Sequence, residues 1–346
     1  MLEQRFEILS SLCYCNSAAG QENQVQNYFK KVITTFVDDI TTDPLGNVIA
    51  HKKGKGKKLM LIAHADEVSM MVTNISPQGY IYCKPCGGVD ATIISARRVH
   101  IIHGEQVVLG VVGKKPIHKI SPEEETVSKK FDGKWIDIGA IDKNDALKYV
   151  SIGDYVYYDS PLSKLNNDLI TGKALDDRCG TLVLLSIAEY IQKKSLNYDV
   201  YFVSSVQEEL GFRGAIVVAN LVKPDACIVI DVTHATDYPS IFPYNEGELK
   251  LRSGCVLTKG PNIDANIFDK LRSCADKNKI EYQIEAIPCP TGTDANFVQI
   301  SNTGVRTALV SIPCRYMHTP YEIVSLQDVQ STIELMCNFL GTNSCI

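Results

Sequence analysis

Five segments of the sequence place carboxylate or imidazole side chains next to apolar stretches. They are HADE from His64, ALDDRCG from Ala174, QEELG from Gln207, DVTH from Asp231 and RYMHTP from Arg315. In an open α/β sheet the ligand site lies beyond the carboxyl ends of the strands, so these segments are expected to meet at one edge. Bringing so many carboxylates together is costly unless cations neutralise them. Nitrogen and oxygen donors without thiolates suit zinc, cobalt or manganese, and we therefore predict a metal site.

Each segment alone has an ordinary structural explanation. A histidine at a strand end is commonly a hydrogen-bonded structural residue. The pair Asp176-Asp177 suits a helix N-cap, and the pair Glu208-Glu209 suits a solvated turn. The metal prediction therefore depends on all five segments reaching the same edge of the sheet.

Alternating patterns of apolar residues indicate the elements that carry these segments. Short continuous apolar runs predict buried strands, and apolar residues three and four apart predict amphipathic helices. The predicted strands cover residues 59–63, 199–206, 226–230, 282–287 and 307–312. The predicted helices cover residues 2–12, 25–36, 181–193, 215–221, 263–277 and 326–340. Strands that alternate with helices predict an α/β fold, with a mixed sheet flanked by helices on both faces.

Residues 68–165 differ from the rest of the chain in their sequence pattern. Short β-rich pieces alternate there with glycine and proline, and the one helical stripe is a short one at 142–149. This pattern predicts a small β-barrel inserted into the chain. A chain of 346 residues also exceeds one ordinary core. We therefore expect a catalytic α/β domain of residues 1–67 and 166–346, and an inserted barrel of residues 68–165.

Composition and charge narrow the classes of partner. The net charge is −5 and no basic face is evident, which argues against nucleic-acid binding. No run approaches the roughly 18 to 20 apolar residues that span a bilayer, so we expect no membrane partner. The first residues lack the apolar stretch of a signal peptide, and the 12 cysteines are interpreted as reduced thiols. These features together predict a cytoplasmic protein.

Six motifs resemble those of the tetrahedral (TET-type) aminopeptidases. In chain order they are HADE, ALDDRCG, VQEELGFRGA, IDVTHA, GTDA and RYMHTP. These are co-catalytic metallo-aminopeptidases of the glutamyl and deblocking aminopeptidase group, some of which were once labelled endoglucanases. The motifs extend from His64 to about Val324. The resemblance implies a zinc-peptidase-like catalytic domain and two divalent metal ions per subunit. Zinc and cobalt are the leading candidates, with manganese as a third.

The resemblance also implies which residues bind the metals. His64 and Asp231 would bind one ion, and Glu209 and His318 would bind the other. Asp176 would bridge both ions. These five residues are the predicted ligands.

Three further residues would support the chemistry. An unusual cis peptide bond to Asp177 would orient Asp176. Asp66 would stand behind His64 and fix the tautomer of its imidazole. Glu208 would act as the general base without binding metal. We also expect the pocket for the first residue of the substrate to draw on residues 262–266 and on Thr291, Gly292, Thr293 and Asp294.

The function implied by the resemblance is removal of N-terminal residues from short peptides. A hydroxide bridging the two metals would attack the carbonyl carbon, with Glu208 taking and returning the proton. Residues 68–165 resemble the family's dimerisation barrel, and members assemble as dodecamers that enclose their active sites. The expected partners are therefore short peptides and further copies of the chain, as dimers that build a dodecamer.

Two other enzyme classes use similar residues. Dinuclear carboxypeptidases and N-acyl amino acid deacylases also carry an HxD motif, a bridging aspartate and a Glu-Glu pair. Their extra domain typically follows the Glu-Glu pair, whereas the insertion here lies between His64 and Asp176, which favours the aminopeptidase. An endoglucanase needs two carboxylates roughly 5 to 9.5 Å apart but no histidines, and Trp135 is the one tryptophan that could stack on a sugar. It is the least favoured function.

Overall fold

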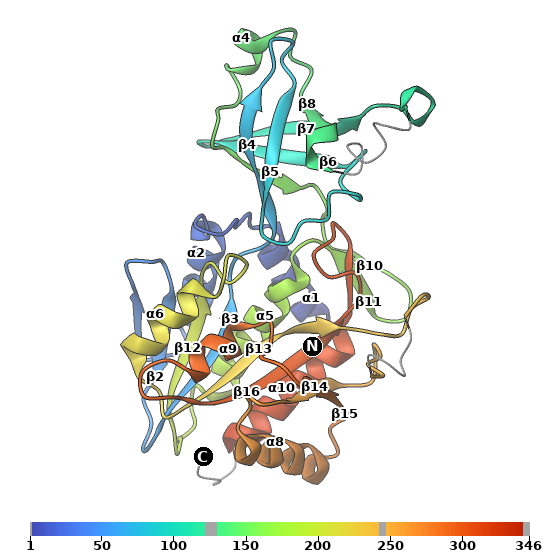
Figure 1. Ribbon diagram of the computed structural model, residues 1–346. Coiled ribbons are helices and arrows are strands. Elements are labelled where there is room, and N and C mark those ends of the chain that lie inside the picture. The colour runs from blue at the N-terminus through green and yellow to red at the C-terminus, as the bar shows by residue number, and fades with distance from the viewer. Residues whose placement is uncertain (1, 122–129, 242–246, 342–346) are drawn as a thin grey trace.

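The computed structural model describes residues 2–121, 130–241 and 247–341. These residues form a layered α/β body and a closed barrel, which lies above the α/β body in Figure 1. Within the described ranges, every helix is too short or too polar to span a bilayer.

The α/β body is built on an eight-stranded mixed sheet, as the sequence predicts. In spatial order its strands are β1, β2, β12, β3, β13, β16, β14 and β15. Their bounds are β1 Asp39–Thr42, β2 Val48–Lys52, β3 Lys58–His64, β12 Asp199–Ser205, β13 Ala226–His234, β14 Cys255–Lys259, β15 Tyr282–Ala286 and β16 Arg306–Cys314. The central strands β12, β3, β13 and β16 are parallel, whereas β2 and β14 run antiparallel to their central neighbours. The carboxyl ends of the central strands therefore meet at one edge.

Helices cover both faces of this sheet (Figure 1). One face carries α1 Leu2–Tyr14, α2 Asn23–Ile33, α5 Leu175–Ile191, α8 Ala265–Asn278 and α10 Leu326–Gly341, and the other carries α6 Arg213–Val222 and α9 Asp294–Gln299. Strand β3 shows why the sequence is continuously apolar there. Leu59 and Leu61 pack into the core on the first face, and Met60 and Ile62 pack into the core on the second. A strand buried on both faces leaves no position for a polar side chain.

The barrel contains six antiparallel strands in the closed order β4, β5, β8, β7, β6 and β9. Their bounds are β4 Ser69–Ile75, β5 Ile81–Cys86, β6 Arg98–His103, β7 Gln106–Lys114, β8 Lys134–Asp137 and β9 Tyr155–Tyr158, and short helices occur at η1 Ile117–Lys119, η3 Phe131–Gly133 and α4 Lys143–Ala146. Side chains that alternate along the strands, such as Val99 and Ile101 of β6, fill the interior. The outer side of β7 is also apolar, because Val107, Leu109 and Val111 are 59%, 59% and 48% exposed.

A small three-stranded sheet lies beside the path by which the chain returns from the barrel. Its strands are β10 Ser163–Lys164, β11 Leu169–Gly172 and β17 Glu322–Ser325. Strand β11 pairs antiparallel with β17, so the returning chain is joined to a segment near the end of the sequence. This pairing brings residues 169–172 next to the loop that carries His318.

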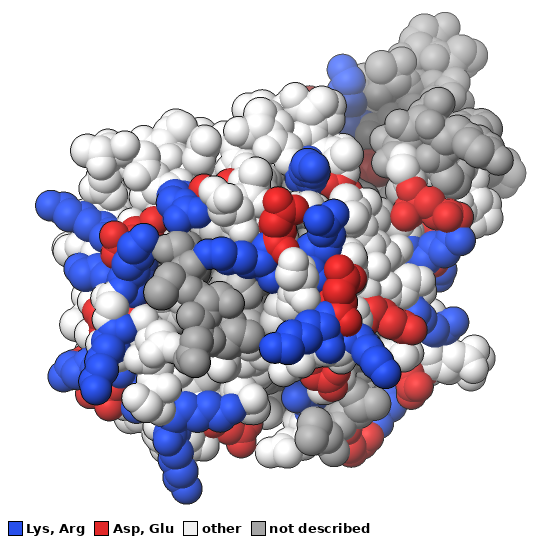
Figure 2. All heavy atoms as spheres, turned by 90° about the horizontal axis from the view of Figure 1, so that it is seen from below, with Lys and Arg blue, Asp and Glu red and all other residues white. Residues whose placement is uncertain are grey.

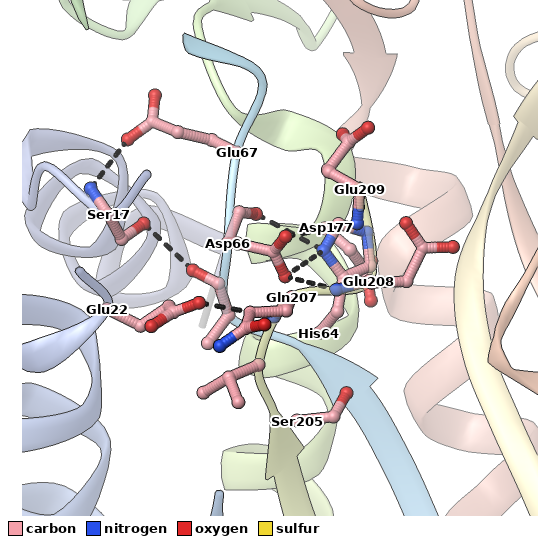
Figure 3. Close-up of polar contacts among 12 residues, drawn as sticks. Ser17, Glu22, His64, Asp66, Glu67, Asp177, Ser205, Gln207, Glu208 and Glu209 are labelled. Carbon is pink, nitrogen blue, oxygen red and sulfur yellow. Dashed lines mark hydrogen bonds and ion pairs between the residues drawn. The ribbon is translucent and has the colours of Figure 1, made fainter. Parts of the chain in front are cut away.

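A buried ion pair joins the outgoing and returning crossings between the two bodies. Glu67 lies just before β4 and Lys173 lies just after β11. The Nζ atom of Lys173 is 2.8 Å and 2.7 Å from the two carboxylate oxygens of Glu67. Glu67 also accepts a hydrogen bond of 3.1 Å from the backbone N–H of Ser17, which Figure 3 shows. The pair therefore holds both crossings against the segment between the first two helices of the chain, at Ser17.

Charged side chains on the underside of the α/β body include both signs. Figure 2 views this face from below, and basic and acidic groups are both spread across it. On this face the basic groups are interleaved with acidic ones.

Candidate metal centre

The carboxyl ends of β3, β12 and β13 bring the first predicted ligands together. His64 is the last residue of β3, and it lies opposite Ser205, the last residue of β12. On the other side the parallel register pairs Ile62 with Val229 of β13, which places Asp231 level with His64. The Nε2 atom of His64 is consequently 3.9 Å from a carboxylate oxygen of Asp231.

Asp176 lies between the two histidines that are predicted to bind different metal ions. The backbone at Asp176 and Asp177 departs from helical geometry near the start of α5, and the peptide bond between them is cis, as the family resemblance implies. The Oδ1 atom of Asp176 is 2.8 Å from Nε2 of His64. Its Oδ2 atom is 3.2 Å from Nε2 of His318. One carboxylate thus faces two imidazoles.

Two sets of side chains that could hold a metal ion share this aspartate. The first set is His64, Asp176 and Asp231, and the second is Asp176, Glu209 and His318. Within each set the ligating atoms lie within 4.8 Å of one another. All five predicted ligands therefore come together, and each set combines imidazole nitrogen with carboxylate oxygen. Donors of these types fit a divalent transition metal such as zinc, cobalt or manganese.

Asp66 is fully buried behind His64 and also supports the two glutamates (Figure 3). Its carboxylate oxygens accept hydrogen bonds from the backbone N–H groups of Glu208 at 2.9 Å and Glu209 at 3.0 Å. The same carboxylate lies 3.6 Å from Nδ1 of His64, whereas the backbone carbonyl oxygen of Asp66 is 3.2 Å from that nitrogen. Asp66 therefore holds the turn after β12 in addition to lying behind the imidazole.

The carboxylate of Glu208 belongs to neither set of ligands. Glu208 is 8% exposed and lines the cavity onto which both sets open. Burial raises the pKa of Glu208 well above its ordinary value, and the nearby carboxylate of Asp231 raises it further. Such a carboxylate can hold a proton at a pH where an exposed glutamate has lost it.

The pKa values of the other acidic groups of the centre are also shifted from their ordinary values. Burial raises the pKa of Asp231 well above its usual range, and burial likewise raises the pKa of Glu209. Burial alone would raise the pKa of Asp176 too, but hydrogen bonds from His318 and His64 hold it below the ordinary value. In this structure the two imidazoles lie against the Asp176 carboxylate. Divalent cations would supply the positive charge that the clustered carboxylates require.

Glu322 is a residue of the centre that sequence reasoning missed. It is 1% exposed, and its two carboxylate oxygens accept hydrogen bonds from the backbone N–H groups of Asp176 at 3.1 Å and His318 at 2.8 Å. Its burial raises its pKa to about 8. Glu322 thus ties together the two backbone segments that carry the shared ligand and the last ligand. The one available signal was its position four residues after His318, at the start of a short strand.

A cavity of about 330 Å³ opens onto the two sets of ligands. Away from those ligands its wall includes Phe212, Val232, His234 and Met317. The wall is therefore partly apolar. The cavity is wide enough for a small side chain or the end of a peptide to lie beside the ligands.

The predicted substrate-binding loop reaches this cavity with only part of its length. Gly292 and Thr293 line the wall. Thr291 is 2% exposed, and its hydroxyl lies 3.2 Å from that of Thr293. Asp294 is also 2% exposed and accepts a hydrogen bond of 2.7 Å from the hydroxyl of Ser205. Thr291 and Asp294 therefore lie behind the wall and support it.

Comparison with known proteins places this chain in a family. Residues 46–335 match the M42 glutamyl aminopeptidase family. The lysyl aminopeptidase of Pyrococcus furiosus is 32% identical over 95% of this chain and 95% of its own. A TET aminopeptidase from the marine sediment archaeon Thaumarchaeota archaeon SCGC AB-539-E09 superposes with a TM-score of 0.93 at 28% identity, over 99% of this chain and 97% of its own. The TET1 peptidase of Pyrococcus horikoshii, described as assembling into a tetrahedron or a large octahedral shell, has a TM-score of 0.86 at 27% identity, over 97% and 99%. This chain therefore belongs to the M42 glutamyl aminopeptidase family of peptide hydrolases.

Proposed function

We propose that this chain is a cytoplasmic aminopeptidase that removes N-terminal residues from short peptides with two divalent metal ions. One observation carries the proposal. The two carboxylate oxygens of Asp176 face two different imidazoles, each of which has a further carboxylate beside it. This arrangement offers two adjacent places for a cation with one shared ligand, as two-metal hydrolases require.

Each residue then has a separate task. His64 and Asp231 would hold one ion, Glu209 and His318 would hold the other, and Asp176 would contribute to both positions. When bound, the ions supply a water of lowered pKa and stabilise the negative charge that develops on the carbonyl oxygen. Zinc, cobalt and manganese are the candidate ions, because imidazole and carboxylate donors suit all three.

Glu208 is proposed to move the proton. Its carboxylate lines the same cavity as the ligands but lies outside both sets, and Asp66 fixes its backbone. The carboxylate accepts a proton from the attacking water and donates it to the departing amine.

Removing the metals should abolish this activity. After chelation, release of chromophores from aminoacyl substrates is expected to fall to background, and adding back zinc, cobalt or manganese should restore it. Elemental analysis of the restored protein should find two ions per chain. N-acyl amino acids and carboxymethylcellulose, assayed in parallel, test the two rival activities. Hydrolysis that survives chelation, or hydrolysis of either rival substrate alone, would contradict the proposal.

The assembly is proposed to be a closed homo-oligomer. We propose that residues 68–165 form the dimerisation domain, and that the dimers build a dodecamer with enclosed active sites. Support comes from the assembling TET1 peptidase of Pyrococcus horikoshii and from the apolar outer side of β7, where Val107, Leu109 and Val111 are exposed. An exposed apolar stripe of this kind commonly marks a protein contact.

Enclosure predicts both a mass and a size filter. Light scattering should give a mass near twelve times 38.2 kDa. Short peptides should be trimmed, whereas folded proteins with flexible N-termini of a few residues should be ignored, because they cannot reach an enclosed site. A stable dimer that trims peptides and folded substrates at similar rates would rule out the enclosed assembly.

A further inference from the structure

The barrel reaches the metal centre through the segment that follows β5. Gly88 lies in this segment and lines the cavity at the ligands. A Cβ atom at Gly88 would lie 2.7 Å from Nδ1 and 3.2 Å from Cε1 of the His318 imidazole. At Gly87, where φ is +88°, a Cβ atom would lie 3.4 Å from Oε2 of Glu209. Two ligands of one proposed metal position therefore pack directly against backbone that belongs to the barrel.

The loop that carries His318 contains unfavourable backbone conformations. Both Tyr316 and His318 have left-handed backbone conformations, with φ of +60° and +62°, which are unfavourable for residues other than glycine. The side chain of His318 is also 35% exposed, whereas that of His64 is 2% exposed. The His318 imidazole uses Nε2 to face Asp176 and Glu209, and its opposite edge faces Gly88. The barrel segment is thus a wall behind the imidazole.

A second contact links the barrel to the same loop. The guanidinium of Arg97 lies over the ring of Tyr321, 5.4 Å from its centroid, which is within the range of a cation–π interaction. Arg97 itself is held in the barrel, because its Nε donates to the carbonyl oxygen of Ile93 at 3.1 Å and its carbonyl oxygen accepts from Val112 at 2.9 Å. The segment from Gly87 to Arg97 therefore touches the His318 loop at two separate points.

We propose that residues 87–97 of the barrel position His318, and that the barrel thereby controls how tightly one of the two metal ions is held. This inference rests on the proposed two-metal function. The other proposed metal position does not rest against the barrel in this way, because its ligands His64 and Asp231 come from adjacent strands of the main sheet. Displacement of the barrel segment should therefore weaken the ion held by Glu209 and His318 and leave the ion held by His64 and Asp231 in place.

The decisive variant is Gly88→Ala. Its methyl group would collide with the His318 imidazole, so the affinity of one metal position should fall by roughly 10-fold or more while the other is unchanged. Calorimetric titration of the metal-stripped protein with zinc, together with elemental analysis, measures both positions without relying on activity. Gly113→Ala is the matched control. Its methyl group would lie 2.7 Å from Nε1 of Trp135 on the neighbouring strand β8, a collision of the same size away from the ligands, and the variant should keep both ions.

A second pair of variants tests the other contact. Tyr321→Ala removes the ring beneath Arg97 and should weaken the same metal position, whereas Tyr321→Phe keeps the ring and should bind zinc as the unaltered chain does. Two unchanged metal positions in Gly88→Ala would overturn the inference, and so would equal losses in Gly88→Ala and Gly113→Ala. If the unaltered chain binds fewer than two ions, the proposed function itself fails. That result is separate from any difference between the variants.

Discussion

Glu208→Gln should keep both metal ions while its kcat falls by about 10²-fold or more. The amide matches the carboxylate in shape but cannot take a proton from the attacking water. The backbone N–H of Glu208 still donates to Asp66 in the variant, so the turn after β12 should be preserved. Steady-state kinetics on aminoacyl substrates and elemental analysis on the same preparation together measure the effect.

Glu209→Gln is the matched variant, because it makes the same change one residue further along the chain. The carboxylate of Glu209 lies 3.3 Å from Nε2 of His318 and belongs to the second set of ligands. This variant should lose affinity for one ion, and excess metal should restore part of its activity. Equal loss of metal in the two variants would show that the roles of Glu208 and Glu209 are wrongly divided.

Lys173→Met should lower the free energy of unfolding by about 3 to 5 kcal/mol. The substitution removes the nearer of two cations from the Glu67 carboxylate, at a position where the Glu67 and Lys173 side chains are 4% and 7% exposed. Arg178 lies 3.5 Å from the same carboxylate but also donates to the backbone carbonyl oxygen of Ala65, so it cannot replace both hydrogen bonds from the lysine. Denaturant unfolding followed by tryptophan fluorescence and circular dichroism measures the change.

An exposed ion pair provides the control for this substitution. Lys164 lies 2.6 Å from a carboxylate oxygen of Glu3, but these side chains are 49% and 71% exposed. Lys164→Met should therefore change stability by less than about 1 kcal/mol. If Lys173→Met lowers the free energy of unfolding by no more than this control does, the buried pair is not what secures the two crossings between the barrel and the α/β body.

The sheet and its ligand-bearing edge could be predicted because their signals are local. The run that ends at His64 is apolar at every position of β3 from Leu59 to Ala63, which only a strand buried on both faces requires. The same holds for Ala226 to Ile230 in β13. Once these runs are identified as parallel strands, the polar residues at their ends must lie near one another.

Other parts of the centre could not be predicted, because they depend on contacts between distant segments. One hydrogen-bond partner of Glu322, His318, lies four residues before it, but the other, Asp176, is distant in the sequence. The role of Glu322 therefore becomes visible only where β17 lies beside Asp176. Gly88 resembles any other glycine of a β-rich segment until the His318 imidazole is placed against it. Burial of Asp294 behind the cavity wall likewise depends on Ser205 of β12, which is far away along the chain.

The strand order has a consequence for the time at which the parts of the protein can fold during synthesis. Strand β3 lies between β12 and β13, both of which are translated after the whole barrel. The barrel strands all fall between Ser69 and Tyr158, so they can pair while the growing chain still lacks both neighbours of β3. The apolar strand that ends at His64 must therefore remain unpaired in the nascent chain until residue 234 has emerged. During that time it is exposed to aggregation or to binding by a chaperone. The second proposed metal position is complete only after His318 follows, so this enzyme should remain inactive until its synthesis is nearly complete.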